Sequence, residues 1–316
     1  MSPVLRTRRD FLRTGTAMAV AAVLPDPPVY SNQTALERRQ PQGLKAACSS
    51  LAFCDLKWDE ALEEIKKLGF RHAELAMFEG FAHVNPSALT DPDAHAKKII
   101  AACTRLDIEP IAIHANFVLG DPNQFTGLTT PDAAARKTVL AQFERVVACA
   151  RIAEIPLIHL APGRVAEAMS PDVAIKNACD VLTQMHALVA RRGLMLAIKN
   201  QTGCIGQDPE EALRILEKVP GLRLDYDLSH VVANQYSVEQ TDSLMKYVAH
   251  VSVRNAKPGN SNIAIEDGDL SYPVHPFIEC FRRRKVNAYV SVEYSSPALR
   301  SNIPAMKAIL QREEML

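Results

Sequence analysis

A short apolar run followed by an amphipathic stretch recurs along this chain at intervals of roughly thirty residues, the size of a β-strand with its following helix. Eight such pairs follow one another from Gly43 onward. The apolar runs are too short and too apolar for anything except buried parallel strands. The expected strands are 44–49, 72–77, 108–114, 156–161, 194–199, 222–227, 250–254 and 288–293.

The stretches between these runs have a helical period, as in Val139, Phe143 and Val146, which predicts helices with one core-facing stripe. Ser170 and Asp208 each precede a proline, a pattern that predicts the start of a helix. Eight units without a break in composition favour an α/β fold, a single (β/α)8 TIM barrel over residues 43–316, rather than an open sheet. No Gly-x-Gly-x-x-Gly follows the first run to favour a dinucleotide fold.

Composition excludes several classes of partner. The 36 basic residues balance 36 acidic ones, so bulk charge attracts neither nucleic acid nor an anionic membrane, and we expect a small ligand. The seven cysteines lack the spacing of a metal finger, and their odd number argues against a disulfide framework. The oligomeric state cannot be read from the sequence.

The first residues differ from the rest. Residues 7–12 read Thr-Arg-Arg-Asp-Phe-Leu, and a short weakly apolar run, 17–24, and a proline-rich stretch, 25–28, follow them. This pattern resembles a twin-arginine export signal. We therefore expect residues 1–42 to be a signal peptide and linker, cleaved between Leu24 and Gly43. The protein is then expected to be exported, periplasmic or extracytoplasmic, with no membrane span in its mature form. The alternative is a disordered basic tail.

Polar residues end most of the apolar runs. In a barrel the carboxyl ends of all strands converge on one mouth, so these side chains are expected to lie together. They are His114, Asn116, His159, Lys199, Asn200, Asp227, His230, His250, Arg254, Asn255 and Glu293.

Several of these segments match the motifs of one family. Residues 224–230 are similar to its Asp-x-x-His segment, 250–255 to its His-x-His strand, 289–294 to its terminal glutamate strand, and 266–272 to a Gly-x-Gly-Glu-x-Asp-Tyr loop. On these motifs the chain resembles the xylose isomerase-like superfamily of sugar-phosphate isomerases and epimerases. The resemblance implies a TIM barrel that binds a carbohydrate or keto sugar at its C-terminal mouth and transfers a proton next to a carbonyl.

The resemblance also implies a divalent cation, held by a glutamate, an aspartate, a histidine and a second glutamate on four successive strands. Asp227 and Glu293 match this pattern, whereas Lys199 replaces the first glutamate and Ser252 the histidine. An ammonium about 4 Å from a divalent ion costs about 8 kcal/mol at an effective dielectric near 20. That cost is comparable with the whole free energy of binding a metal with micromolar affinity, about 8 kcal/mol. We therefore expect no cofactor; manganese, magnesium or zinc would bind Asp227 and Glu293 only if the site retains a metal.

In a site without metal, Lys199 is expected to serve as the cation and to pair with Asp227 and Glu293. Glu293 would then be the general base, with Lys199 or His230 as the acid. Further substrate contacts are expected from His114, His159, Asn200, Arg254 and Asn255. The chain is thus interpreted as an isomerase-like or epimerase-like enzyme.

Other interpretations remain open at this point. Asp227 and Glu293 could form a structural ion pair with Lys199 or Arg254, which would make the chain a carbohydrate-binding pseudoenzyme. The histidines could be buried structural groups. A desolvated Lys199 could form a Schiff base. A relative of apurinic endonucleases in the same superfamily is disfavoured, because the chain lacks a zinc-binding cluster and a basic surface.

Overall fold

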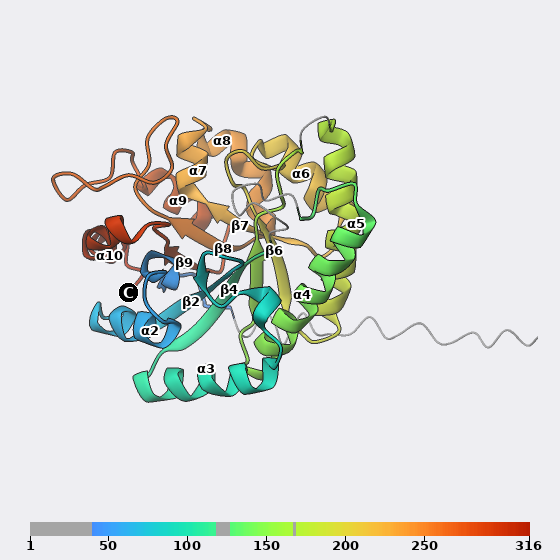
Figure 1. The fold of residues 1–316 in the computed structure, drawn as a ribbon. Helices are drawn as coiled ribbons and strands as arrows, with labels where there is room; N and C mark the ends of the chain where they lie inside the picture. The colour runs from blue at the N-terminus through green and yellow to red at the C-terminus, as the bar shows by residue number, and fades with distance from the viewer. Residues whose placement is uncertain (1–39, 118–126, 167–168) are drawn as a thin grey trace, which may run out of the picture.

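The computed structural model describes residues 40–117, 127–166 and 169–316. These residues form a closed ring of eight parallel strands in the order β1-β9-β8-β7-β6-β5-β4-β2, which the pairing of β1 with β2 completes (Figure 1). The strands are β1 (Leu44–Ser49), β2 (His72–Phe78), β4 (Glu109–Asn116), β5 (Leu157–Leu160), β6 (Met195–Lys199), β7 (Arg223–Asp227), β8 (Val248–Val253) and β9 (Ala288–Val292). The predicted (β/α)8 barrel and all eight of its strands are confirmed, with ends shifted by two residues or fewer.

The sequence did not predict β3 (Ala82–His83), which pairs antiparallel with the end of β2. Its turn is fastened by polar contacts: Gly80 N donates to Asn85 Oδ1 at 2.9 Å, and His83 Nε2 lies 2.9 Å from the carbonyl of Ser50. Two residues carry too little hydrophobic periodicity to be recognised as a strand.

Helices surround the ring of strands (Figure 1). They are α2 (Trp58–Lys67), α3 (Pro92–Leu106), α4 (Ala133–Ile152), α5 (Pro171–Ala190), α6 (Pro209–Lys218), α7 (Leu228–Ala233), α8 (Val238–Thr241), α9 (His275–Arg283) and α10 (Ile303–Arg312), with 3-10 turns at Ser50–Phe53, Pro86–Ala88, Asp242–Tyr247 and Pro297–Asn302. As predicted, α5 and α6 begin behind capping side chains: Ser170 accepts from Val173 N, and Asp208 accepts from Glu210 N and Glu211 N.

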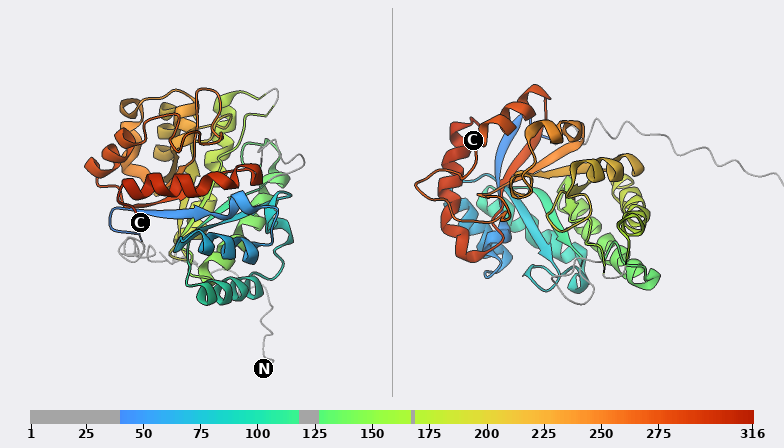
Figure 2. Two further views of the ribbon diagram at one scale, coloured as in Figure 1. Left: turned by 90° about the vertical axis from the view of Figure 1, so that its left-hand side faces the viewer. Right: turned by 90° about the horizontal axis from the view of Figure 1, so that it is seen from above.

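The last helix completes the outer layer beside the first strand. In the left view of Figure 2, α10 lies along β1, and Ala46 N donates to the carbonyl of Met315 at 2.8 Å just beyond α10. Among the described residues, no helix combines the length and apolarity that crossing a bilayer requires. Residues 1–39, which hold most of the predicted leader, lie outside the described part of the chain.

Inside the barrel, polarity changes from floor to mouth. Near the amino-terminal ends of the strands, one apolar cluster contains Ala47, Ile111, Ala112, Leu157, Ala197 and Tyr289. Because side chains two residues apart point to the same face of a strand, the next inward-facing positions follow directly. They are polar: His114, His159, Lys199 and Ser291 lie two residues after Ala112, Leu157, Ala197 and Tyr289, and Glu293 lies two residues further. The interior of the barrel is therefore apolar toward the amino-terminal ends of the strands and polar toward the mouth.

Candidate functional site

Lys199 ends β6 and extends into the centre of the barrel, where its side chain is only 1% exposed. Its Nζ lies 3.0 Å from Asp225 Oδ2, 3.0 Å from Asp227 Oδ2 and 3.0 Å from each carboxylate oxygen of Glu293. It also donates to Ser252 Oγ at 2.8 Å. Strands β6, β7 and β8 and the residue directly after β9 thus each supply a group to one ammonium-centred cluster.

Charges in this cluster keep each other ionised. Burial alone would lower the pKa of Lys199, but the carboxylates of Asp225, Asp227 and Glu293 outweigh it and raise that pKa above its ordinary range. Burial alone would likewise raise the pKa of Glu293, but Lys199 foremost, with His114 and Arg254, holds it well below normal. The predicted pairing of Lys199 with Asp227 and Glu293 is therefore present as a fully ionised contact.

A second cation, Arg254, follows the end of β8 and lies beside the same acids. Its Nη1 donates to Asp227 Oδ2 at 3.1 Å, to the Glu293 carbonyl at 3.0 Å and to Glu293 Oε1 at 3.4 Å. Burial raises the pKa of Asp227, but Arg254 first and then Lys199 outweigh it and bring the pKa below its ordinary range. Two cations thus neutralise the acids at the mouth.

Local structure fixes Asp227 and its neighbour Asn200. Asp227 ends β7 and caps α7, since its Oδ1 accepts from Ser229 N at 3.1 Å and from the Ser229 hydroxyl. The Asn200 side chain bridges β6 and β7: its Oδ1 accepts from Asp227 N at 2.7 Å, and its Nδ2 donates to the Asp227 carbonyl at 3.2 Å. Asn200 therefore uses its amide to position Asp227.

His230 lies in α7, three residues after Asp227. Arg254 Nη2 donates to His230 Nε2 at 3.0 Å, and His230 Nδ1 lies 2.9 Å from Thr202 Oγ1. Burial, together with Arg254 and Lys199, outweighs the nearby Asp227 and lowers the pKa of His230 to about 4. The ring is therefore neutral: Arg254 donates to its Nε2, and Thr202 holds its Nδ1 through both the hydroxyl and the backbone N–H, which donates to Nδ1 at 3.2 Å.

Below the mouth lies a second buried ionic layer that contains Glu74 and Asp225, neither of which was predicted. His159 lies between them, with Nε2 3.2 Å from Glu74 Oε2 and Nδ1 2.9 Å from Asp225 Oδ2. Burial would lower the pKa of His159, but the two carboxylates outweigh it and raise the pKa to about 9. His159 is therefore an imidazolium enclosed by protein, beneath the reach of a ligand at the rim.

Three histidine rings stack across the barrel. His159 packs on His114 at 4.3 Å and on His250 at 4.8 Å, with rings within 26° of parallel. His250 Nδ1 lies 2.9 Å from Asp225 Oδ1, and its Nε2 lies 2.9 Å from Ser291 Oγ. At the other end, the edge of His114 faces Phe78 at 4.6 Å. The stack links the lower ionic layer to the mouth.

Among the predicted site residues, the structure brings together Lys199, Asp227, His230, Arg254, Glu293 and His114. Asn255 lies apart from them and organises the loop between β8 and α9: its Nδ2 donates to the Ala264 carbonyl at 2.6 Å, and its Oδ1 accepts from Ser271 N at 2.8 Å. Strand alternation could have revealed Asp225, because it lies two residues before Asp227 and faces the same side. Glu74 could have been noticed as a lone acid within an apolar strand.

A metal at the position that the family pattern implies does not fit these residues. The Lys199 ammonium lies within 3.0 Å of oxygens from Asp225, Asp227 and Glu293, and it takes the central position among them. Two other groups of side chains have a composition compatible with a divalent cation. One contains Glu74, His114, His159 and Glu293, and the other contains His159, Asp225 and His250. Both include His159, whose Nε2 and Nδ1 lie 3.2 Å from Glu74 and 2.9 Å from Asp225, ion-pair contacts that a metal ion would have to replace.

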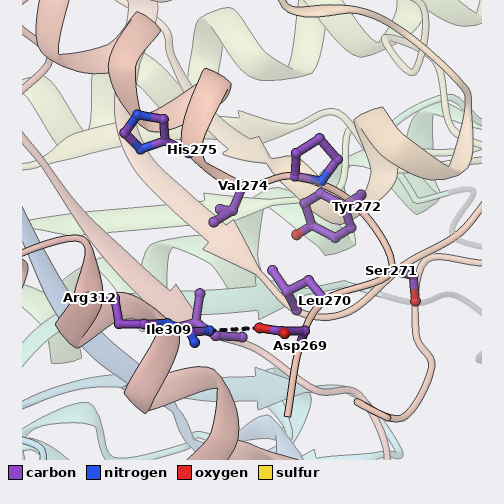
Figure 3. Close-up of a pocket in the computed structure, with 9 residues that line it drawn as sticks. Asp269, Leu270, Ser271, Tyr272, Val274, His275, Ile309 and Arg312 are labelled. Carbon is purple, nitrogen blue, oxygen red and sulfur yellow. Dashed lines mark hydrogen bonds and ion pairs between the residues drawn. The ribbon is translucent and has the colours of Figure 1, made fainter. Parts of the chain in front are cut away.

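The hollow in Figure 3, about 390 Å³, lies outside this cluster. It is lined by residues 269–275 of the β8–α9 connection together with Ile309 and Arg312 of α10. Arg312 contacts Asp269 at 3.0 Å, which holds the connection against α10. Tyr272 joins this hollow to the site, because its hydroxyl donates to the Arg254 carbonyl at 3.0 Å.

Comparison with known families agrees with this architecture. The model described as "Xylose isomerase-like TIM barrel" matches residues 62–312, most of the chain. The chain belongs to this family. No curated protein sequence matches it.

Solved structures similar to this xylose isomerase-like barrel include a D-tagatose 3-epimerase-like protein, with 16% identity, a TM-score of 0.70, and coverage of 86% of this chain and 97% of the other. A xylose isomerase domain protein from Planctomyces limnophilus has 16% identity, a TM-score of 0.65 and coverage of 87% and 96%. A 3-keto-D-glucoside 4-epimerase from E. coli has 14% identity, a TM-score of 0.63 and coverage of 85% and 99%. At such identities these likenesses establish the shared fold.

Replacing Lys199 by methionine should destabilise the barrel by about 3–5 kcal/mol, because the change leaves buried carboxylates without their shared cation. Urea denaturation of the wild type and Lys199→Met measures the difference. Lys176→Met is the matched control, since the Lys176 side chain is 72% exposed and pairs only with Asp180, and it should change stability by about 0.5 kcal/mol or less. Equal effects of the two substitutions would contradict the assigned role of Lys199.

His159 should make stability decrease at alkaline pH. Its pKa in the folded protein is about 9, above the ordinary value near 6.5, so its contribution is complete below pH 6.5 and is lost as pH rises through 9. Across this window, wild type should lose up to about 3 kcal/mol more unfolding free energy than His159→Gln. Urea denaturation at several pH values measures this difference, and His275→Gln at an exposed position is the control. Parallel profiles for wild type and His159→Gln would refute the enclosed imidazolium.

Proposed function

We propose that this barrel binds a carbohydrate or keto sugar at its C-terminal mouth and acts as a sugar isomerase or epimerase whose cation is Lys199 rather than a metal. The observation that carries the proposal is the position of the Lys199 ammonium between Asp227 and Glu293, with Arg254 beside it. Membership in the family and its epimerase structural neighbours support the reaction class. Export by the leader of residues 1–42 is part of the proposal and rests on the sequence alone.

Proton transfer next to a carbonyl needs a base and a group that stabilises the enediolate oxygen. Glu293 supplies the carboxylate, and the cationic groups of Lys199 and Arg254 supply fixed positive charge where the substrate oxygen would develop negative charge. The C–H electron pair moves into the enediolate, and the proton moves to Glu293. Lys199 or Arg254 stabilises the oxygen by donating hydrogen bonds, so no step depends on a metal.

The resting structure holds Glu293 in a weakly basic form, because Lys199 contacts both of its oxygens and its pKa lies well below normal. A substrate oxygen that accepts a hydrogen bond from Arg254 or Lys199 would take that donor from Glu293. Loss of a cationic donor raises the basicity of a carboxylate. Substrate binding is thus the step that would activate the base. Since Arg254 is buried and bonded to His230, Asp227 and Glu293, this side chain must shift as the ligand enters.

The same ion pairs favour a second candidate, a carbohydrate-binding pseudoenzyme. If Arg254 keeps its contacts with Asp227 and Glu293 when the ligand is bound, the Glu293 carboxylate stays paired with cations and cannot take a proton from the sugar. The acids then serve only to hold the strand ends at the mouth together. Both candidates predict sugar binding. They differ in the role of Glu293: its loss should abolish turnover in the enzyme, whereas in the pseudoenzyme it should only alter the affinity for the sugar.

The decisive substitution is Glu293→Gln, which removes the base and retains the side-chain shape. The protein is incubated in deuterated water with D-fructose, D-psicose, D-tagatose and a 3-keto-glucoside, and deuterium at the carbon beside the carbonyl is measured by NMR. Wild type should incorporate the label, and Glu293→Gln should do so about 10²- to 10⁴-fold more slowly. Binding, measured by calorimetry, should persist.

Glu279→Gln on α9 provides the matched control, because Glu279 is half exposed and forms its ion pair with the neighbouring Arg282, outside the site. It should leave incorporation unchanged. Sugar binding by wild type with neither label incorporation nor conversion to another sugar would support the pseudoenzyme and reject the enzymatic proposal. Absence of both binding and incorporation across the panel would reject a sugar site of either kind.

A further inference from the structure

Glu293 has two unlike sets of neighbours. The cations of Lys199 and Arg254 lie within hydrogen-bonding distance of its carboxylate. His114 Nδ1 approaches Oε2 at 3.3 Å from β4. Among the described residues around this carboxylate, His114 therefore offers a nitrogen that can accept a proton from it.

The approach of His114 is not a completed hydrogen bond. His114 Nδ1 is buried and has no partner with hydrogen-bond geometry, and the same holds for Glu74 Oε1, which lies 3.9 Å from this nitrogen. Buried polar atoms of this kind normally have partners, so two such atoms beside Glu293 require an explanation. A proton on His114 Nδ1 would face both Glu74 and Glu293, which are ionised carboxylates.

Packing holds the His114 ring in this place. One face stacks on His159 at 4.3 Å, and its edge meets Phe78 at 4.6 Å. Its Nδ1 lies 3.3 Å from Glu293 Oε2 and has no hydrogen-bond partner, so this nitrogen is placed to accept a proton from Glu293. The His159 imidazolium opposes a second charge on the stack, whereas Glu74 and Glu293 favour it. The protonated state of His114 is therefore suited to a transient role.

We infer that His114 receives from Glu293 the proton that Glu293 removes from the substrate, stores it between Glu74 and Glu293, and returns it by the same route. This inference rests on the proposed isomerase or epimerase function and deepens it. The proton passes from the substrate carbon to Glu293 Oε2 and then to His114 Nδ1, while the C–H electron pair remains in the enediolate. On return, Glu293 delivers the proton to the neighbouring carbon on the same face, and the hydroxyl proton of the enediolate passes to the former carbonyl oxygen, so that the isomerised sugar forms with atoms and charge in balance. His114 acts through Glu293 and is a positioning residue.

The route is sealed by protein. The His114 side chain is 4% exposed and that of Glu74 is fully buried. A proton stored there exchanges with water more slowly than one on an accessible carboxylate. The chain should therefore return part of the substrate's own hydrogen to the product.

The test uses full-length protein and each ketose of the panel deuterated beside the carbonyl, with the reaction run in ordinary water. Mass spectrometry measures the label that remains in the product, and the same samples give the turnover rate. Wild type should retain a measurable fraction of the deuterium. In His114→Gln, retention should fall to background and turnover should fall about 10²-fold or more. Glu74→Gln should lower retention by a larger factor than it lowers turnover, because it removes one carboxylate that holds the stored proton.

His275→Gln is the control, since His275 lies at the exposed start of α9, where it pairs with Glu313, and belongs to neither the ring stack nor the carboxylate pair that holds the proton. Its retained fraction should equal that of wild type, whatever its stability. Turnover by wild type with complete loss of deuterium would overturn the role of His114 and leave the proposed function intact. Equal retention in wild type and His114→Gln would do the same. Absence of any turnover in wild type would overturn both.

Discussion

One buried ammonium organises the interior of this barrel. Lys199 is the common partner of Asp225, Asp227 and Glu293, three carboxylates that burial would otherwise force to protonate or to remain ionised at a cost of several kcal/mol each. The carboxylates in turn keep Lys199 charged at full burial. Because Asp225 and Asp227 come from β7, Glu293 directly follows β9 and Lys199 ends β6, the contact also fixes how these strands meet at the mouth.

Lys199 and a metal ion would not make equivalent sites. A divalent ion carries twice the charge and exchanges ligands, whereas an ammonium carries one charge, donates three hydrogen bonds and stays tethered to its strand. Arg254 makes up part of the difference by adding a second positive charge beside Asp227 and Glu293. The neutral His230 ring accepts from this guanidinium and helps to orient it. The mouth therefore depends on two cationic side chains from neighbouring parts of the barrel.

The sequence was sufficient for the architecture because hydrophobic periodicity and helix caps are local signals. It also placed Lys199, Asp227, Arg254, His230 and Glu293 together, since strand ends in a barrel converge. It did not predict the layer of Glu74 and Asp225 or the use of His159 as their cation, because those pairings join residues far apart in the chain, as with Glu74 and His159. Asn200 and Asn255 were expected to bind substrate, yet their amides bond to backbone, which depends on loop conformation that residue type alone does not reveal.

The Lys199 ammonium lies among the acids where the family pattern places a metal ion, and the metal content of the protein tests directly whether it replaces that ion. Purified wild type and a Lys199→Glu, Ser252→His double variant are each equilibrated with manganese, magnesium or zinc, dialysed and measured by elemental analysis, with crystals of both to locate any ion. Wild type should retain no stoichiometric metal, and the double variant should gain one. A divalent ion bound between Asp227 and Glu293 in wild type would contradict this expectation.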